Sequence, residues 1–214
     1  MGNVTRAMSY SISKNEKNAI SVLDFHGTPL SWFRLDDGVM GGQSETVHVA
    51  KDGFLHFDGI LNTNGGGFTS IRAKINPGLL GSETTGLNIR YRGDGKTYKV
   101  LLSDGNRGGP FARTPTWQAD LPTEKREDDS WDEVTIPYTR LQPAFGGGPK
   151  SQPSEEERKQ YTFNQLDMKE IGLMLSLRLS DGSPNPPETF GEGVFPFSLK
   201  VQSIKAVTSQ QSTK

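Results

Sequence analysis

The sequence predicts an all-β protein in which two antiparallel sheets pack into a sandwich. Apolar and polar residues alternate in many short runs, which is the period of half-buried strands. Glycine (25 residues) and proline (13 residues) are abundant and apolar residues make up only 32% of the chain, a composition that favours turns over long helices. A length of 214 residues suits one such domain, which we place at residues 20–207, with flexible tails at 1–19 and 208–214.

Six alternating runs predict successive strands in the first two thirds of the chain. Every second side chain is apolar in each run, so one face of each strand is expected to lie against the core. The runs are TVHVA (46–50), FLHFDGIL (54–61), TSIRAKI (69–75), GLNIRYRG (86–93), KTYKVLLS (96–103) and SWDEVTIPY (130–138). Glycine-rich steps separate the runs, and RGDGK at 92–96 predicts a β-hairpin between two of them.

Two further runs near the C-terminus also predict strands. In the run at 171–180, the inner face is expected to carry Ile171, Leu173, Leu175, Leu177 and Leu179. In the run at 194–201, the inward residues are Phe195, Phe197, Leu199 and Val201. Pro196 indicates an edge strand or a strand beginning, because proline cannot donate to a ladder. The alternation then loses its phase, which predicts a bulge or a strand end near Gln202 and Ser203.

Helical signals are scarce. Ser154 followed three residues later by Glu157 is typical of a capping box, so we expect one or two solvated helical turns at 155–160. Polar segments at 103–116, 141–160 and 180–193 are too long for simple hairpin turns. They are expected to be loops that offer interaction surface.

Composition excludes several classes of function. The chain has 24 Lys and Arg against 25 Asp and Glu, so no broad positive field attracts nucleic acid. It has no cysteine, which excludes disulfides and thiolate metal sites, and its three histidines lack the spacing of zinc enzymes. No apolar run reaches the length of a membrane span. We therefore expect no cofactor, no metal site and no transmembrane segment.

The run DDGVMGGQS at 36–44 places two carboxylates beside three glycines. It lacks the lysine of a phosphate loop, as does NGGGF at 64–68, and strands are expected to follow both. Asp36 and Asp37 are neighbours and point to opposite faces, so they cannot flank one bond as acid and base. We expect one of them to accept backbone hydrogen bonds from the glycine turn; the alternative is sugar-hydroxyl or metal binding. His56 and Asp58 share a strand face, which favours a polar surface over a catalytic pair.

Aromatic residues are the remaining candidates for binding. Sugar sites combine flat rings with planar polar groups, and Trp117 beside Gln118 has that chemistry. The alternative for every such ring is core packing, which exposure would distinguish. The candidate rings are Trp32, Tyr98, Trp117 and Trp131.

Three motifs in order, D-D-G-V-M-G-G-x-S, G-G-G-F-x-S-x-R and R-G-D-G-x-x-Y, make the chain resemble the complex I intermediate-associated protein 30 family over about residues 32–207. The resemblance implies a galactose-binding-domain-like jelly roll. The motif positions expected to be structural are Asp36, Asp37, Gly38, Met40, Gly41, Gly42, Ser44, Gly66, Gly67, Phe68, Ser70, Arg92, Gly93, Asp94 and Gly95. Arg72 and Tyr98 also belong to the motifs and are candidates for binding.

The resemblance also implies a function without catalytic residues. Members of this kind assist assembly of mitochondrial respiratory complex I by binding a membrane-arm intermediate, so a protein partner and a mitochondrial location are expected; the alternative location is cytoplasmic. Residues 1–19, basic and rich in serine before Glu16, would then be a weak presequence. The alternative function is glycan binding on a concave sheet face through Trp32, Arg72, Tyr98, Trp117 and Gln118. Arg72 is also predicted to pair with Asp36 or Asp37, and a structural calcium ion stays open.

Overall fold

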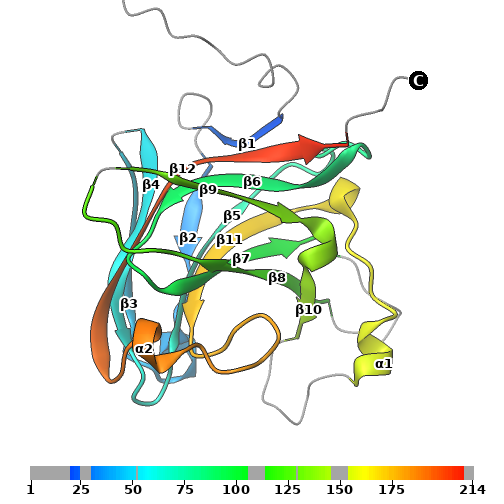
Figure 1. The fold of residues 1–214 in the computed structure, drawn as a ribbon. Coiled ribbons are helices and arrows are strands. Elements are labelled where there is room, and N and C mark those ends of the chain that lie inside the picture. The colour runs from blue at the N-terminus through cyan, green and yellow to red at the C-terminus, as the bar shows by residue number, and fades with distance from the viewer. Residues whose placement is uncertain are drawn as a thin grey trace, which may run out of the picture.

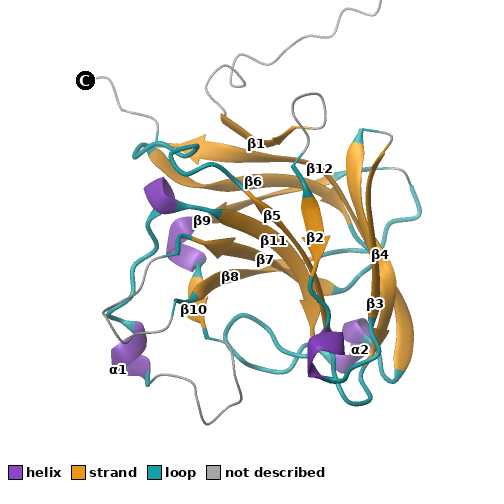
Figure 2. Cartoon of the chain, turned by 180° about the vertical axis from the view of Figure 1, so that it is seen from behind, coloured by secondary structure: helices purple, strands orange, loops and turns teal. Residues whose placement is uncertain are grey.

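The computed structural model describes residues 20–24, 30–51, 53–105, 114–128, 130–145 and 154–209, and within them two antiparallel sheets pack face to face (Figures 1 and 2). Sheet A consists of β1 (Ile20–Asp24), β3 (Glu45–Lys51), β4 (Phe54–Asn62), β6 (Thr84–Arg92), β9 (Asp132–Pro137) and β12 (Val194–Thr208). Sheet B consists of β2 (Trp32–Arg34), β5 (Phe68–Lys74), β7 (Thr97–Ser103), β8 (Thr116–Pro122), β10 (Gln142–Ala144) and β11 (Glu170–Ser176). The predicted all-β sandwich is confirmed.

The strand order brings distant segments together. Sheet A runs β3-β4-β12-β6-β9, with β1 paired to the C-terminal half of β12, and sheet B runs β10-β8-β7-β11-β5-β2. All neighbouring strands in these sheets are antiparallel. Sequence-adjacent strands such as β6 and β7 thus belong to different sheets, as in a jelly roll.

One hydrophobic core fills the space between the sheets, because alternate residues of each strand point inward. Leu173 of β11 and Leu199 of β12 are fully buried. The rings of Phe57 and Phe197, both from sheet A, lie 5.0 Å apart, and Phe57 lies 6.1 Å from Tyr98 of sheet B. These edge-on contacts join the two layers.

β12 is longer than the sequence indicated. The predicted bulge is confirmed, since the pairing of β12 with β6 shifts between Val201 and Ser203. The strand does not end there but continues to Thr208. Pro196 lies near the beginning of the strand, where β12 pairs with β4; pairing with β6 starts at Lys200. The missing N–H of Pro196 therefore costs no bond to β6.

The inner face predicted for residues 171–180 is correct only up to Leu175. β11 ends at Ser176, and Leu177 lies 42% exposed instead of inward. The backbone N–H of Leu177 still donates to Gly67 O (2.9 Å), and the chain then bends, with the Ser176 hydroxyl donating to Arg178 O (2.8 Å). Leu179 is only half-buried.

The predicted hairpin at residues 92–96 is wrong. The two runs that it joins form β6 and β7, which belong to opposite sheets, so this turn is a crossing between layers. A tight turn between two alternating runs has the same local sequence in both cases. Which sheet receives the second run depends on distant strands.

Short elements complete the fold. The sequence did not predict β1, β2, β8 or β10 as strands. The last three belong to sheet B and are three to seven residues long. The helices are α1 (Glu155–Arg158) and α2 (Pro187–Phe190), with 3-10 turns at Asp37–Met40, Tyr138–Arg140 and Gln165–Asp167. The predicted capping box at Ser154 and Glu157 is confirmed. Of the long loop predictions, residues 106–113 and 146–153 lie outside the described residues, as do the tail residues 1–19 and 210–214.

Candidate functional site

Asp37 is the centre of a buried polar joint between the two glycine motifs. Its side chain is only 1% exposed, and its Oδ1 atom accepts the backbone N–H of Ser44 at 3.0 Å. Its Oδ2 atom accepts the Ser44 hydroxyl (2.8 Å) and the backbone N–H groups of Gly67 (2.7 Å) and Phe68 (3.4 Å). The expectation that one aspartate accepts backbone hydrogen bonds is met by Asp37, and the carboxylate is bonded on both oxygens.

The glycines of both motifs make room for this carboxylate. A Cβ atom on Gly42 would lie 2.3 Å from Asp37 Cγ, and one on Gly66 would lie 2.2 Å from Asp37 Oδ2. Gly41 has a φ of 88°, which ends the 3-10 turn in the left-handed region. By contrast, a Cβ on Gly38 would meet no atom within 4 Å. The glycines therefore serve the shape of the joint.

Asp36 connects the sheets beside this joint. Its Oδ1 atom accepts the hydroxyl of Thr46 from β3 (2.6 Å) and the hydroxyl of Thr69 from β5 (2.9 Å), and the two hydroxyls also contact each other. One strand belongs to sheet A and the other to sheet B. The Ser70 hydroxyl fixes the approach to this turn by donating to Leu35 O (2.7 Å).

The RGDG motif makes a second joint between the layers. Asp94 accepts the hydroxyl of Tyr98 in sheet B (2.9 Å), the backbone N–H of Ser198 in sheet A (3.0 Å) and the ammonium of Lys96 (3.0 Å). Burial raises the pKa of Tyr98 well above its usual value, and the neighbouring Asp94 raises it further. The tyrosine therefore stays a neutral donor to this carboxylate.

Neighbouring motif residues fit the same crossing. A Cβ on Gly93 would lie 2.2 Å from the Thr123 side chain, and Gly95 has a φ of 95°. The guanidinium of Arg92 lies over the ring of Trp131, 4.8 Å from its centroid, so this half-buried tryptophan is covered by a cation. Trp131 is thus part of a stacked pair.

Arg72 does not pair with Asp36 or Asp37 as predicted. It projects opposite Ile71 and Ala73 onto the outer face of sheet B, as expected, but its Nη1 atom lies 2.9 Å from Glu170 Oε1. Glu170 comes from the adjacent strand β11. The prediction failed because Asp36 and Asp37 accept hydrogen bonds from other residues and Glu170 of the neighbouring strand lies within reach of Arg72, which the sequence could not show.

The aromatic candidates for sugar binding face the core. Tyr98 and Trp117 are buried, and Trp32 is half-buried and packs against the core cluster. None of these three rings forms a platform on the outer face of sheet B. Gln118 does lie on that face, where its Oε1 atom accepts the ammonium of Lys99 (3.1 Å).

Lys99 is a buried cation on the outer face of sheet B. It is 5% exposed, and burial lowers its pKa to about 8, although Asp120 and Asp181 oppose the shift. Asp120 is held by Ser180, whose backbone N–H and hydroxyl donate to its two oxygens at 2.8 and 2.7 Å. The loop that follows β11 is thus attached over this part of the sheet (Figure 1).

His56 and Asp58 share the outer face of sheet A as predicted. Their His56 Nδ1 and Asp58 Oδ2 atoms are 3.5 Å apart, and the Ser198 hydroxyl donates to Asp58 Oδ1 (2.6 Å). The serine therefore binds the carboxylate and does not contact the histidine. In a catalytic triad the serine hydroxyl donates to the histidine, which acts as its base, so this arrangement is not a triad.

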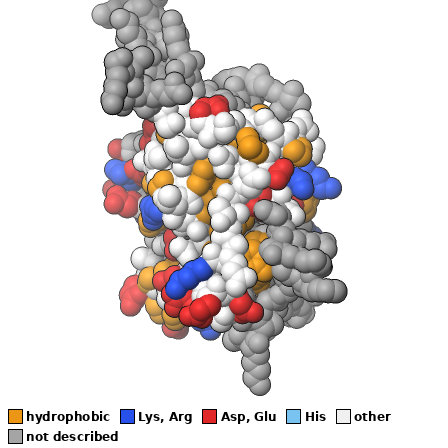
Figure 3. Space-filling model, turned by 90° about the vertical axis from the view of Figure 1, so that its right-hand side faces the viewer, with side chains coloured by type: hydrophobic (Ala, Val, Ile, Leu, Met, Phe, Trp, Pro, Cys, Tyr) orange, Lys and Arg blue, Asp and Glu red, His pale blue; other side chains and the backbone are white. Residues whose placement is uncertain are grey.

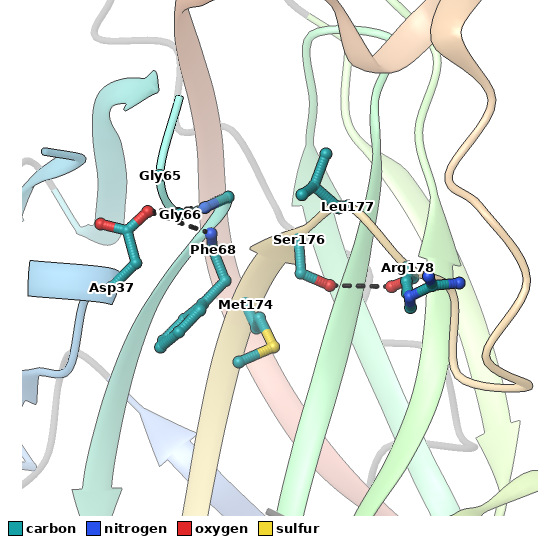
Figure 4. Close-up of a pocket in the computed structure, with 9 residues that line it drawn as sticks. Asp37, Gly65, Gly66, Phe68, Met174, Ser176, Leu177 and Arg178 are labelled. Atoms are coloured by element: carbon teal, nitrogen blue, oxygen red, sulfur yellow. Dashed lines mark hydrogen bonds between the residues drawn. The ribbon is translucent and has the colours of Figure 1, made fainter. Parts of the chain in front are cut away.

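The Phe68 pocket is an open cavity of about 420 Å³ at the end of the outer face of sheet B. Its walls come from the glycine turn before β5 and from the end of β11, and Figure 4 shows these two segments on opposite sides. Sequence reasoning missed it. The lining residues are Asp37, Gly65, Gly66, Gly67, Phe68, Met174, Ser176, Leu177 and Arg178.

No group of three His, Asp or Glu side chains in the described part of the chain could hold a metal, and no helix there is long and apolar enough to cross a membrane. Acidic and basic side chains are interspersed on the face shown in Figure 3, in line with a formal net charge of −1. The Phe68 pocket is the site that these observations single out.

A family model described as complex I intermediate-associated protein 30 matches residues 23–201 of the chain. This span contains both joints and the Phe68 pocket. No curated protein sequence matches.

The fold is similar to solved carbohydrate-binding structures. A family 11 carbohydrate-binding module of the cellulosomal cellulase Lic26A-Cel5E of Clostridium thermocellum gives a TM-score of 0.58 at 12% identity, covering 92% of this chain and 98% of that chain. The family 11 module from Clostridium thermocellum in complex with a β-1,3-1,4-mixed-linked tetrasaccharide gives 0.54 at 13% identity, covering 89% and 96%. The agarase AgWH50C gives 0.52 at 10% identity, covering 89% of this chain and 24% of that one. At these identities the likeness establishes the fold alone.

Proposed function

Because the chain belongs to the complex I intermediate-associated protein 30 family, we propose that it is a non-catalytic assembly factor that binds a membrane-arm intermediate of mitochondrial respiratory complex I. Family membership supports the assembly role, and the matched span covers both sheets. The proposed location is the mitochondrion, where such an intermediate is built.

One observation supports a binding role over a catalytic one. The motif carboxylates of Asp36, Asp37 and Asp94 all accept hydrogen bonds from residues that join the two sheets. A catalytic carboxylate must reach a substrate, and Asp37 is 1% exposed. The motifs therefore shape a scaffold, while the Phe68 pocket stays open for contact with a partner.

Glycan binding remains the alternative, and it has less support. Its expected platform was an exposed ring among Trp32, Tyr98 and Trp117, and these rings lie in or against the core. The similar solved modules share the fold but only 10–13% of the sequence. Tryptophan fluorescence measured against a panel of oligosaccharides would revive this alternative if it responded to one of them.

The assembly role is tested by affinity purification from mitochondria of the native organism. The tagged chain should co-purify with membrane-arm subunits and be absent from the finished complex, and loss of the chain should accumulate an incomplete intermediate on native gels. Normal complex I assembly without the chain would refute the proposal. An organism that lacks complex I would refute it as well.

A further inference from the structure

The Phe68 pocket has apolar walls. Phe68 and Met174 project from the neighbouring strands β5 and β11, and Leu177 closes one side (Figure 4). The glycine backbone at 65–67 forms the other side. A volume of about 420 Å³ lies in the range of sites that hold small ligands or side chains. Methionine adapts to differently shaped apolar groups, so this pocket does not require one rigid ligand.

Two of the three polar side chains of the pocket, Asp37 and Ser176, are already engaged. The Asp37 carboxylate accepts hydrogen bonds on both oxygens, and the Ser176 hydroxyl donates to Arg178 O at 2.8 Å. A bound sugar would place several hydroxyl groups against this lining, and those facing Asp37 and Ser176 would lose water without gaining a partner. An apolar group loses nothing of that kind. The pocket therefore favours an apolar group over a sugar.

Arg178 adds a positive charge at the rim. Its side chain is exposed, and one of its N–H groups, on Nη1, donates to Gly182 O at 3.0 Å. No ion pair joins it to an acidic side chain within the described residues. A guanidinium binds a carboxylate through two parallel hydrogen bonds, which fixes its direction as well as its affinity. The rim of this pocket is therefore complementary to an acidic group.

We propose that the Phe68 pocket receives a large apolar side chain from an extended segment of a protein partner, and that Arg178 binds a carboxylate next to that side chain on the same segment. The proposal rests on the proposed function in that the partner is a protein. Leu177, 42% exposed at the rim, covers the inserted side chain. The apolar contact supplies affinity, and the charge pair selects the segment and its direction.

The test begins with a phage-displayed library of random dodecapeptides selected on the full chain. The selected consensus should place a large apolar residue beside Asp or Glu. A synthetic consensus peptide should shift the methyl signal of Met174 in NMR spectra of the methionine-labelled chain. Replacing the acid of the peptide by its amide should weaken binding about tenfold, the loss of one exposed charge-assisted contact. This arm uses the unaltered chain and does not depend on a variant that folds.

Variants of the chain then locate the contact. Leu177→Glu and Arg178→Glu should each weaken the consensus peptide at least about tenfold, and Arg178→Lys should retain part of the affinity. Ile60→Glu is the matched control, because Ile60 is 40% exposed on the outer face of sheet A, and it should bind like the unaltered chain. Thermal melting of each variant shows whether the fold is intact.

Three outcomes would overturn the proposal. The first is a consensus without an acidic residue, and the second is peptide binding that survives Leu177→Glu. The third is a chain that selects no peptide but shows the Met174 shift with laurate, because the pocket would then bind a fatty acid instead of a peptide. The proposed assembly role fails independently. Leu177→Glu protein that still co-purifies with complex I subunits refutes the pocket alone, whereas failure of the unaltered chain to co-purify refutes the assembly role.

Discussion

Asp37→Asn should destabilise the protein strongly without changing its shape. Asp37 accepts four hydrogen bonds, one on Oδ1 and three on Oδ2, whereas an asparagine has one acceptor oxygen. If that oxygen takes the place of Oδ2, the new amide group faces the backbone N–H of Ser44, and two buried donors oppose each other. An orphaned buried donor costs about 1–3 kcal/mol, and the three retained bonds lose their charge assistance.

The expected loss for this variant is about 3 kcal/mol in the free energy of unfolding. For a chain of this size that lowers the melting temperature by roughly 6–12 °C. Circular dichroism melting at neutral pH measures it. Asp128→Asn is the control, because Asp128 is exposed and should shift the melt by less than about 2 °C. If Asp37→Asn melts within about 2 °C of the unaltered chain, the buried joint does not stabilise the fold and the reasoning is refuted.

Three further predictions test other contacts. Gly42→Ala should lower the free energy of unfolding in urea by about 2–4 kcal/mol, because its Cβ would lie 2.3 Å from Asp37 Cγ. Gly38→Ala is the control: its Cβ would meet no atom within 4 Å, so it should change that free energy by under about 0.5 kcal/mol. Burial lowers the Lys99 pKa from 10.5 to about 8, so below pH 8 the charged ammonium destabilises the folded state by about 3 kcal/mol. Between pH 8 and 10.5 the folded state has lost this proton and the unfolded state still holds it, so stability rises with pH. Lys99→Met should therefore stabilise the protein by about 2 kcal/mol at pH 7, after loss of one hydrogen bond. This advantage should shrink as the pH rises and change sign below pH 10.5, because the unaltered chain gains about 3 kcal/mol over that range; an advantage that grows with pH would contradict this. Arg72→Ala should lower the melting temperature by a few degrees, and a double-mutant cycle with Glu170→Ala should give a coupling of about 1 kcal/mol; additive losses would show that the 2.9 Å pair contributes nothing.

The strands were predictable because apolar and polar residues alternate along a half-buried strand. The runs that became β4, β6, β7 and β11 alternate clearly, and the phase change after Val201 located the bulge of β12. The local sequence does not show which of the two sheets each strand joins. For this reason RGDGK was predicted as a hairpin although it crosses between layers. Pairing across layers is decided by distant contacts, such as the one between Asp94 and Ser198.

The candidate site was less predictable than the fold. Adjacent aspartates beside glycines predicted that a carboxylate accepts amide hydrogen bonds, and Asp37 does so. The partner of Arg72 was predicted wrongly because Glu170 lies 98 residues away in the sequence. The Phe68 pocket combines the turn before β5 with the end of β11, and the pairing of these two strands brings them together. No local sequence pattern shows that these two segments lie side by side.

Register explains how this fold can serve recognition without a sugar platform. Along β8, Trp117 points inward and Gln118 outward, and along β7 the same alternation buries Tyr98 and places Lys99 on the outer face. A shift of one residue would turn both rings outward and bury the polar side chains, so the phase of two strands decides which surface a partner meets. In this chain that surface carries paired charges, such as Arg72 with Glu170, and ends at the Phe68 pocket. Shared architecture therefore leaves the ligand undetermined, and the side chains that alternate outward select it.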